Sequence, residues 1–563
     1  MAVHSRPASP SGGSDSDDCS AEESSSLADI QASMIIALHS YAGSDEKLKE
    51  QLIAMYHSWL KVTPAVLGES SEESPSDPPL QRLQHFLDTV LYSLAPVDAQ
   101  GSSGTAKDSS ATLVETASKW CQSLPSSEGA KCRCDAVWYD KGQRVLTYVA
   151  DGRETIAYGC KTCGLSSASC ICVACFDAGE HEGHDFFISR SDYGCCDCGD
   201  AYAWRPEGFC KKHTGPLPNV DPADALPSIT RSILPTAIGV VCSVLLGMIH
   251  ETVAMKNPQS MSSLRSSHQL VDDQVSMILQ WLMDLSTLHD GLRRSTAKAI
   301  LKSVALRFDK ETDEMVPFEF EMKGIREGGR QGTIIEALLT SLHKLGIKGR
   351  KALTNFIVDQ MLDLTFKHDF SILFVRLYHD LALARTSPAK DKGLLLASST
   401  VADIQRHSEL GDFTCQMFTR KDVTVMLATE YDILGTILRT ARDMLRRTIM
   451  REKVDEDTAI YQGVDVRHAI IKKHELTQCT MDLLYVLDHD EVHSVIMEND
   501  GKIMKEVVAP GWCALLKLAQ FCYPNRVQRG NHVEFSDPDW TGALSLHTDL
   551  VSHSWLLIDI IYR

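Results

Sequence analysis

Cysteine and histidine are concentrated in one short part of this chain, and this constrains the fold more than any other feature. Eleven of the 18 cysteines lie between Cys132 and Cys210, and the other seven are scattered. The N-terminal residues contain no apolar segment of the kind that directs secretion, so we expect a reducing compartment in which structural disulfides are rare. A dense cluster of thiols and imidazoles under these conditions predicts zinc binding.

The candidate ligands fall mostly into five closely spaced pairs, C-x-x-C twice, H-x-x-H, C-x-C and C-x-x-H. Such short spacings let one tight turn offer two ligands to one ion. The predicted zinc ligands are Cys134, Cys160, Cys163, Cys172, Cys175, His181, His184, Cys196, Cys198, Cys210 and His213. Eleven ligands are one short of three tetrahedral sites. Either one of Cys132, Cys170 and Cys195 also binds, or one thiolate bridges two ions.

The segment HEGH at 181–184 superficially resembles the H-E-x-x-H motif of zinc proteases. Its second histidine follows at i+3 instead of i+4, and the surrounding sequence is typical of a loop. A catalytic zinc also keeps one position open, whereas ligands here are abundant enough to close every site. We therefore expect structural zinc and no catalytic residue; a metalloenzyme that uses HEGH is the least favoured alternative.

The composition argues against two classes of partner. The chain has 56 Lys and Arg residues against 75 Asp and Glu, a formal net charge of −19, and an acidic chain repels the phosphate backbone of nucleic acids. The apolar run from Ile233 to Ile249 is almost long enough to span a membrane. Pro235, two glycines and the lack of a basic flank favour a buried core helix instead. We therefore expect neither a nucleic-acid partner nor a membrane.

Four regions differ in composition. Residues 1–26 form an acidic, Ser-rich tail that we expect to be disordered, and residues 27–125 show helical apolar spacing interrupted by two flexible linkers. Residues 130–216 hold the Cys/His cluster, and residues 221–563 show one amphipathic helical pattern after another. The predicted fold is mainly α: a small loop-rich zinc domain followed by an extended all-α helical scaffold.

Five stretches of the C-terminal region are each expected to contain a helix. They are 274–288, 333–345, 371–384, 426–447 and 479–497. The chain ends at WLLIDIIYR, within an apolar pattern that has neither a cap nor a polar tail. We therefore expect it to be the N-terminal part of a longer protein.

The ligand pattern resembles the UBR box, the zinc-binding domain with which N-recognin ubiquitin ligases recognise N-degrons. The matching segments are CDAVW (134–138), YGCKTCG, CICVACF, GEHEGHDF, CDCGD, AW and GFCKKH (208–213). The stretches CKTCGLS and GEHEGHDFFISRS look most like the type-3 branch of that family, or like a related plant or protist ligase.

This resemblance implies three zinc ions and a shared ligand. The first ion would be held by Cys160, Cys163, His181 and His184, the second by Cys134, Cys172, Cys175 and Cys196, and the third by Cys175, Cys198, Cys210 and His213. A Cys175 thiolate that bridges two ions would account for eleven ligands at three sites.

Two aspartates lie among these ligands, Asp197 and Asp200, and we expect them to project from a rigid turn as free carboxylates. An α-amino group has a pKa of about 7.7–8.0, so a free protein N-terminus is mostly cationic at pH 7 and suits such a site. The resemblance implies that Asp200 and the backbone carbonyl of Cys195 bind this amino group. It also implies that Asp197 contacts a basic first side chain and that Trp138 forms an aromatic wall. On residue types alone, the aspartates could equally cap turns or orient zinc ligands.

Two departures from the family pattern concern specificity. Family members that bind basic N-termini carry Asp and Thr in the loop between the two C-x-x-C pairs, where this chain has Ser166 and Ala168. Since a guanidinium needs several acceptors in one plane, smaller or different N-termini are expected to fit better. The segment 139–154 is longer than usual, and its alternating apolar residues predict a small hairpin beside the pocket.

The resemblance implies a function that this chain would perform only in part. After Cys210 no C-x-x-C pair remains to build a RING, so we expect an E2 ubiquitin-conjugating enzyme to bind through a region outside this chain. The expected function is the substrate-recognition portion of a RING-type E3 ubiquitin ligase of the N-degron pathway, in the cytoplasm and also in the nucleus. The alternative is a zinc-stabilised adaptor without ligase activity.

Overall fold

The computed structural model describes the zinc-finger region and most of the helices that follow it. The described residues are 54, 78–94, 119, 139–140, 143–144, 155–167, 169–191, 196–213, 215, 220–254, 261–309, 312, 314–320, 332–385, 409–453, 460–464, 475–519, 528–529, 532–533, 548, 550–552 and 554–561.

The Cys/His region, which we call the box, is built on a small antiparallel sheet. Its strands are β3 (Thr155–Cys160), β4 (Ile171–Cys172) and β5 (Phe186–Ser191), in the order β4-β3-β5. The short helix α6 (Val173–Ala178) follows β4 directly. Phe176 of α6 stacks between the rings of Tyr158 and His181, with centroid distances of 4.0 and 4.5 Å. The remainder of the box is loop, so few residues are available to form an apolar core.

The helices that follow form the scaffold, and its first half packs around α7 and α8. The Asp221 side chain caps the 3₁₀ turn η4 (Pro222–Ala225) at its start by accepting a hydrogen bond from the Ala223 N–H. The helices of this half are α3 (Pro78–Ser93), which precedes the box, α7 (Ser228–Ala254), α8 (Met261–Leu288), α9 (Asp290–Lys302), α11 (Ile334–Ser341) and α12 (Ile347–Gln360). Their apolar faces belong to one continuous buried cluster.

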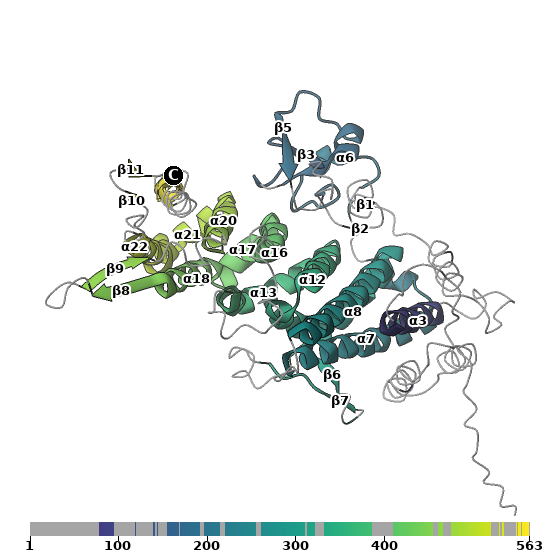
Figure 1. Ribbon diagram of the computed structural model, residues 1–563. Coiled ribbons are helices and arrows are strands. Elements are labelled where there is room, and N and C mark those ends of the chain that lie inside the picture. The colour runs from purple at the N-terminus through teal and green to yellow at the C-terminus, as the bar shows by residue number, and fades with distance from the viewer. Residues whose placement is uncertain are drawn as a thin grey trace, which may run out of the picture.

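The same buried cluster continues through the second half of the scaffold. Its helices are α13 (Leu364–Arg385), α16 (Glu409–Phe418), α17 (Lys421–Glu430), α18 (Ile433–Thr448), α20 (Glu475–Leu487), α21 (Asp490–Ile503), the π-helical turn η6 (Met504–Val508) and α22 (Ala509–Ala519). The helices follow one another in an extended row, with the box on one side of it (Figure 1). The predicted fold class, a loop-rich zinc finger followed by a helical scaffold, is confirmed.

The apolar run at Ile233–Ile249 lies within α7, and Pro235 is inside this helix. By length and composition Ser228–His250 could cross a membrane, but 83% of its most apolar window is buried inside the protein. The neighbouring helices α8 and α9 cover it. The prediction of a buried core helix is confirmed.

The scaffold also contains antiparallel hairpins that the helical patterns did not predict. They are β6 (Leu306–Asp309) with β7 (Glu314–Pro317), β8 (Ile449–Lys453) with β9 (Ile460–Val464), and the short pair β10 (Gln528–Arg529) with β11 (His532–Val533). Within the box, before β3, β1 (Tyr139–Asp140) pairs with β2 (Gln143–Arg144). A hairpin was predicted there, although residues 145–154 lie outside the described part of the chain.

Two of the stretches predicted as helical are divided in the structure. The chain breaks between α17 and α18 at Asp432, where φ is 48° and the carboxylate accepts a hydrogen bond from the Gly435 N–H at 3.2 Å. Asp432 thus caps the start of α18 and does not extend α17. A similar break at His489 separates α20 from α21. The apolar spacing continues across both breaks, and therefore concealed them.

Candidate zinc centre and recognition turn

The first group of predicted ligands is assembled by the end of a strand and two tight turns. Cys160 ends β3, and the Gly164 N–H donates to the Cys160 carbonyl at 2.7 Å, which folds the chain back at Cys163. A second turn brings His184 close to His181, whose carbonyl accepts the His184 N–H at 3.1 Å. The four ligand atoms of these cysteines and histidines all lie within 4.8 Å of one another.

The other predicted ligands form two groups that share one cysteine. One group contains Cys175, Cys198, Cys210 and His213, and the other contains Cys172, Cys175 and Cys196. In each group all ligand atoms lie within 4.8 Å of one another. The fourth predicted member of the smaller group, Cys134, lies outside the described residues. Cys175 is therefore placed where a bridging thiolate would have to be.

Distances between donor atoms fit tetrahedral zinc. With Zn–S and Zn–N bonds of about 2.3 and 2.0 Å, neighbouring ligand atoms of a tetrahedron lie roughly 3.5 Å apart. The Cys163 sulfur lies 3.8 Å from Nδ1 of His181 and 3.2 Å from Nδ1 of His184. The Cys210 sulfur lies 3.0 Å from Nδ1 of His213. Each four-donor group would therefore hold a zinc ion within a closed ligand shell.

The surroundings of these donors suit a structural ion. The described cysteines are free thiols, so no disulfide ties these loops together. Burial raises the pKa of the Cys163 thiol to about 12, whereas hydrogen bonds, with Cys175 first, lower the pKa of Cys198 to about 5. A bound zinc ion would hold such thiols as thiolates and cross-link loops that lack a core of their own. Because four donors close the shell that contains His181 and His184, and these two histidines lie on a turn, the geometry gives no support to a protease-like centre.

Asp197 and Asp200 lie in the turn that carries Cys196 and Cys198, but they are not exposed. Their exposed fractions are 3% and 0%. Asp197 Oδ2 accepts a hydrogen bond from the Cys170 N–H at 2.9 Å, and Asp200 Oδ1 accepts one from the Tyr202 N–H at 3.1 Å. The prediction that both carboxylates project freely is therefore wrong, because each folds back to cap a backbone donor. We call the segment Asp197–Tyr202 the recognition turn.

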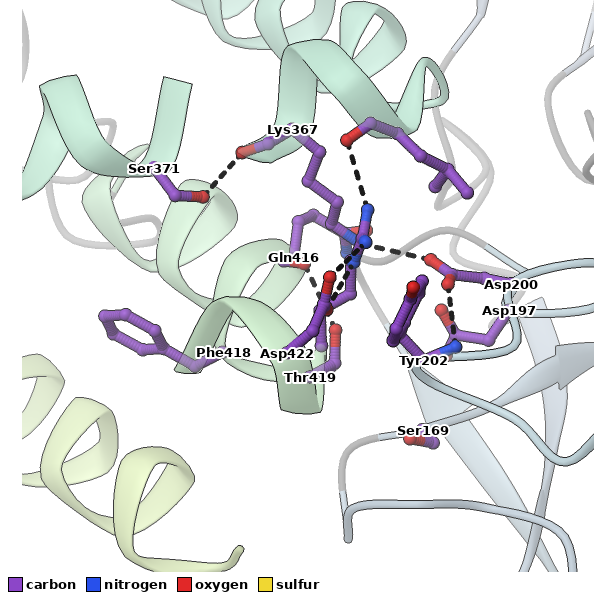
Figure 2. Close-up of polar contacts among 12 residues, drawn as sticks. Ser169, Asp197, Asp200, Tyr202, Lys367, Ser371, Gln416, Phe418, Thr419 and Asp422 are labelled. Carbon is purple, nitrogen blue, oxygen red and sulfur yellow. Dashed lines mark hydrogen bonds and ion pairs between the residues drawn. The ribbon is translucent and has the colours of Figure 1, made fainter. Parts of the chain in front are cut away.

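The scaffold places an ammonium group against the recognition turn. Nζ of Lys367 lies 4.0 Å from Oδ2 of Asp200, and the two side chains are 1% and 0% exposed. Figure 2 shows Lys367 reaching from its helix toward Asp200, with Asp197 and Tyr202 next to the contact. An ionised carboxylate this deeply buried needs a nearby positive charge to offset the loss of water, and Lys367 supplies one.

Arg420 supplies a second positive charge. Its guanidinium lies over the Tyr202 ring, 4.7 Å from the centroid, and forms two hydrogen bonds of 2.9 and 2.6 Å to the Asp422 carboxylate. Burial lowers the pKa of Arg420, but the charges of Asp200 and Asp422 act in the opposite direction, and the net pKa is raised. The guanidinium therefore stays charged beside the recognition turn.

Both cations lie at the starts of scaffold helices. Lys367 is in the first turn of α13, and Arg420 directly precedes α17. The Lys421 N–H, the first of α17, donates to the Tyr202 carbonyl at 3.1 Å, so the box satisfies a donor that has no partner within its own helix. Leu362, between α12 and α13, joins the apolar cluster formed by the zinc-binding cysteines. The box is thus docked through both polar and apolar contacts.

The loop between the two C-x-x-C pairs lies beside another scaffold turn. Ser166 Oγ lies 3.0 Å from Ser169 Oγ, and the Ser167 N–H donates to the Asp488 carboxylate at 2.5 Å. Ser166 is thus part of a neutral hydroxyl pair. The other predicted pocket positions, Trp138, Ala168 and Cys195, lie outside the described residues.

Sequence reasoning found the acidic residues of the recognition turn but missed the basic residues that meet them. Lys367 and Arg420 are 167 and 220 positions after Asp200, so no local pattern links them. A weak signal existed, because Lys367 in LTFKHDF lies three positions from both Leu364 and Phe370, where helical apolar spacing predicts a buried residue.

Comparisons with known proteins agree with this geometry. Residues 145–213 match the family described as the zinc finger in N-recognin (UBR box). This span contains every predicted zinc ligand except Cys134.

Relatives of the chain are similar well beyond the box. The human E3 ubiquitin-protein ligase UBR3 is 23% identical over 499 residues, which cover 76% of this chain and 26% of that protein. The Arabidopsis thaliana E3 ubiquitin-protein ligase PRT6 is 23% identical over 408 residues, 72% of this chain and 18% of that protein. The Schizosaccharomyces pombe E3 ubiquitin-protein ligase ubr1 is 34% identical over 117 residues, 20% of this chain and 6% of that protein. The matched regions span about a quarter of these relatives or less. Residues 145–213 thus contain a UBR box, and the chain is similar to UBR-box proteins, including type-3 members, that are named as E3 ubiquitin-protein ligases.

Proposed function

We propose that this chain is the substrate-recognition portion of an E3 ubiquitin-protein ligase of the N-degron pathway. In this proposal the box binds free protein N-termini and directs those proteins to ubiquitination and proteasomal degradation. The names of the relatives support the ligase class. The E2 enzyme would bind through a region that is not in this chain, and the scaffold would connect the box to that region.

One observation in the structure carries the proposal: an ammonium group lies next to a carboxylate of the recognition turn. Nζ of Lys367 lies 4.0 Å from Asp200 Oδ2. The α-amino group of a protein is also a primary ammonium near pH 7, so it is attracted to the same carboxylate. A bound N-terminus would form charge-assisted hydrogen bonds with this carboxylate, which are stronger than neutral ones, and these would require a free, unacetylated N-terminus.

Asp197 has a different part in this proposal. Its Oδ2 accepts the Cys170 N–H and its own N–H donates to the Cys170 carbonyl, both at 2.9 Å. Asp197 therefore fixes the recognition turn to the strand that leads into Cys172, and its negative charge adds to the attraction for a basic first side chain. Trp138 and the Cys195 carbonyl complete the proposed pocket as an aromatic wall and a second acceptor.

The preferred first residue would be set by the loop that contains Ser166 and Ala168. Ser166 offers a hydroxyl that is engaged with Ser169, and this loop has no carboxylate of its own. Since a guanidinium is bound best by several acceptors in one plane, we propose that small or uncharged first residues are preferred to arginine.

Peptide binding to the full chain tests the proposed function. Each peptide of a set that varies only in its first residue is measured in free and N-acetylated form. We expect some free peptides to bind and acetylation to abolish the binding. Asp200→Asn should weaken binding while the zinc content is retained, and Asp185→Asn, an exposed carboxylate of the box, is the matched control. Equal binding of free and acetylated peptides would refute N-terminus recognition.

A further inference from the structure

Lys367 presents to Asp200 the same chemical group that a substrate N-terminus would present. Each is a primary ammonium with one positive charge and three hydrogen-bond donors. The Lys367 and Asp200 side chains are 1% and 0% exposed, so the carboxylate has little room for a second ligand. Two ammonium groups at one buried carboxylate would also repel each other strongly, because the local dielectric constant is low.

We propose that the box and the scaffold form a closed, self-inhibited arrangement in which Lys367 occupies the place of the substrate's α-amino group. The inference rests on the proposed function, since it assigns a competitor to the same carboxylate. Substrate binding then requires the recognition turn to move away from the N-terminal ends of α13 and α17. Docking of the box on the scaffold and binding of an N-terminus are mutually exclusive at Asp200.

The position of Lys367 explains why the closed state is stable. A lysine in the first turn of a helix faces the positive end of the helix dipole, which is unfavourable. The Asp200 carboxylate compensates both for this position and for the burial of the ammonium. When the turn moves away, Lys367 can reach water, because its long side chain is flexible. Opening therefore need not leave a buried, uncompensated charge.

The remaining contacts suit a reversible interface. Among the described residues they include the Arg420–Tyr202 ring contact, one backbone hydrogen bond from Lys421, the apolar contacts of Leu362 and Val358, and the hydrogen bond between Ser167 and Asp488. Ser167 and Asp488 are both exposed. Such mixed polar and apolar contacts are typical of domain interfaces that open and close. If only a small fraction of molecules is open, the apparent affinity for a peptide falls to that fraction of the affinity of the open form.

The experiment compares four full-length proteins: wild type, Lys367→Met, Tyr202→Ala and the control Lys351→Met. Lys367→Met removes the competing charge with little change in volume, and Tyr202→Ala loosens the docking contact without changing a charge. Lys351 lies on the exposed side of α12, so its change is chemically matched but remote. For each protein we would measure zinc content, affinity for the free and acetylated peptides, and hydrogen exchange of the Lys421 N–H, which reports docking directly.

We expect Lys367→Met and Tyr202→Ala to bind free peptides at least about tenfold more tightly than wild type, and Lys351→Met to match wild type. Exchange of the Lys421 N–H should accelerate in Tyr202→Ala, and in wild type when a binding peptide is added. If Lys367→Met loses zinc or does not fold, the inference is judged from two other results. These are the peptide affinity of Tyr202→Ala and the effect of added peptide on exchange of the Lys421 N–H in wild type.

Two other results would overturn the inference in distinguishable ways. If wild type binds free peptides, and Lys367→Met and Tyr202→Ala bind them no more tightly, Lys367 is no competitor while N-terminus recognition stands. If no protein binds any free peptide although Tyr202→Ala exchanges its Lys421 N–H rapidly, the opened turn is not an N-terminus site. The inference and the proposed function then fail together.

Discussion

The hydroxyl of Tyr378 donates a 2.6 Å hydrogen bond to Oδ2 of Asp482, 104 positions later in the chain. Oδ1 of the same carboxylate accepts hydrogen bonds from Thr414 and Gln478 at 2.6 and 2.7 Å. The carboxylate thereby joins α13, α16 and α20 within the scaffold. Burial raises the pKa of Asp482 to about 6, although these three hydrogen bonds act to lower it.

This raised pKa predicts a specific dependence of stability on pH. The folded state holds the Asp482 proton more tightly than the unfolded state, whose pKa is near 3.8. The protonated carboxyl therefore stabilises the fold at low pH, and that contribution is lost as the pH rises from about 4 to above 6. The difference between a pKa near 3.8 and one of about 6 corresponds to roughly 3 kcal/mol in the free energy of unfolding.

Asp482→Asn should remove this pH-dependent contribution to stability, because an amide does not titrate. We would measure the free energy of unfolding of wild type and variant by denaturant titration between pH 4 and 7.5. The stability of wild type relative to Asp482→Asn should fall as the pH rises through this range. Taking the difference cancels the loss of zinc at low pH, which affects both proteins. Glu430→Gln, an exposed carboxylate at the end of α17, is the control, and a difference that does not vary with pH would contradict the prediction.

Cys175 is predicted to affect two metal sites at once. It lies in two of the ligand groups, so Cys175→Ser should remove a ligand from two ions. Because zinc binding supplies folding free energy in such loop-rich domains, the variant should lose at least two of the three proposed zinc ions and the ordered structure of the box. Zinc per chain, measured by elemental analysis, tests this. Cys513→Ser changes an exposed thiol in α22 and should keep the wild-type zinc content, whereas loss of only one ion in Cys175→Ser would refute the bridging role.

Leu362 should couple the stability of the box to that of the scaffold. It is 8% exposed and belongs to the apolar cluster of the zinc-binding cysteines, although it lies between two scaffold helices. Leu362→Ala would leave a cavity at this contact, at a cost of about 2 kcal/mol or more. We expect faster hydrogen exchange at Lys421 and unchanged zinc content. Leu516→Ala, at a position that is 38% exposed, should leave exchange at Lys421 unchanged, and equal behaviour of the two variants would show that Leu362 does not hold the box in place.

The amino-acid sequence predicts the fold class and the ligand groups because both depend on local spacing. Helical periodicity marks α8, α11 and α13, and the paired cysteines mark the zinc-binding turns. The same periodicity could not show the breaks at Asp432 and His489, because the apolar spacing continues across the two residues that separate the helices at each break. It also gave no sign of the β6–β7 hairpin, whose strands have only four residues each.

The part of the candidate site that the sequence could not predict is the part built by the scaffold. Asp200 was identified as a charged residue near the zinc ligands, but its exposure depends on Lys367 and Arg420, far away in the chain. Whether a carboxylate is free or buried is decided by tertiary packing. The prediction of an exposed Asp200 carboxylate was wrong for this reason. The predicted grouping of the neighbouring cysteines depends on local spacing and agrees with the structure.

The loop between the C-x-x-C pairs gives the last prediction, which concerns specificity. Changing Ser166 to Asp and Ala168 to Thr together would restore the acidic and hydroxyl groups that the resemblance associates with basic N-termini. We expect the double variant to bind Arg-initiated peptides about tenfold or more tightly than the unchanged loop does, since a carboxylate forms charge-assisted, bidentate hydrogen bonds with a guanidinium. The comparison is best made in the Lys367→Met protein, in which the proposed competitor is absent. Peptides that begin with Gly serve as the control, because they lack the side chain that the new carboxylate would contact. An equal gain for Gly- and Arg-initiated peptides would mean that the loop acts on docking of the box and not on the choice of the first residue.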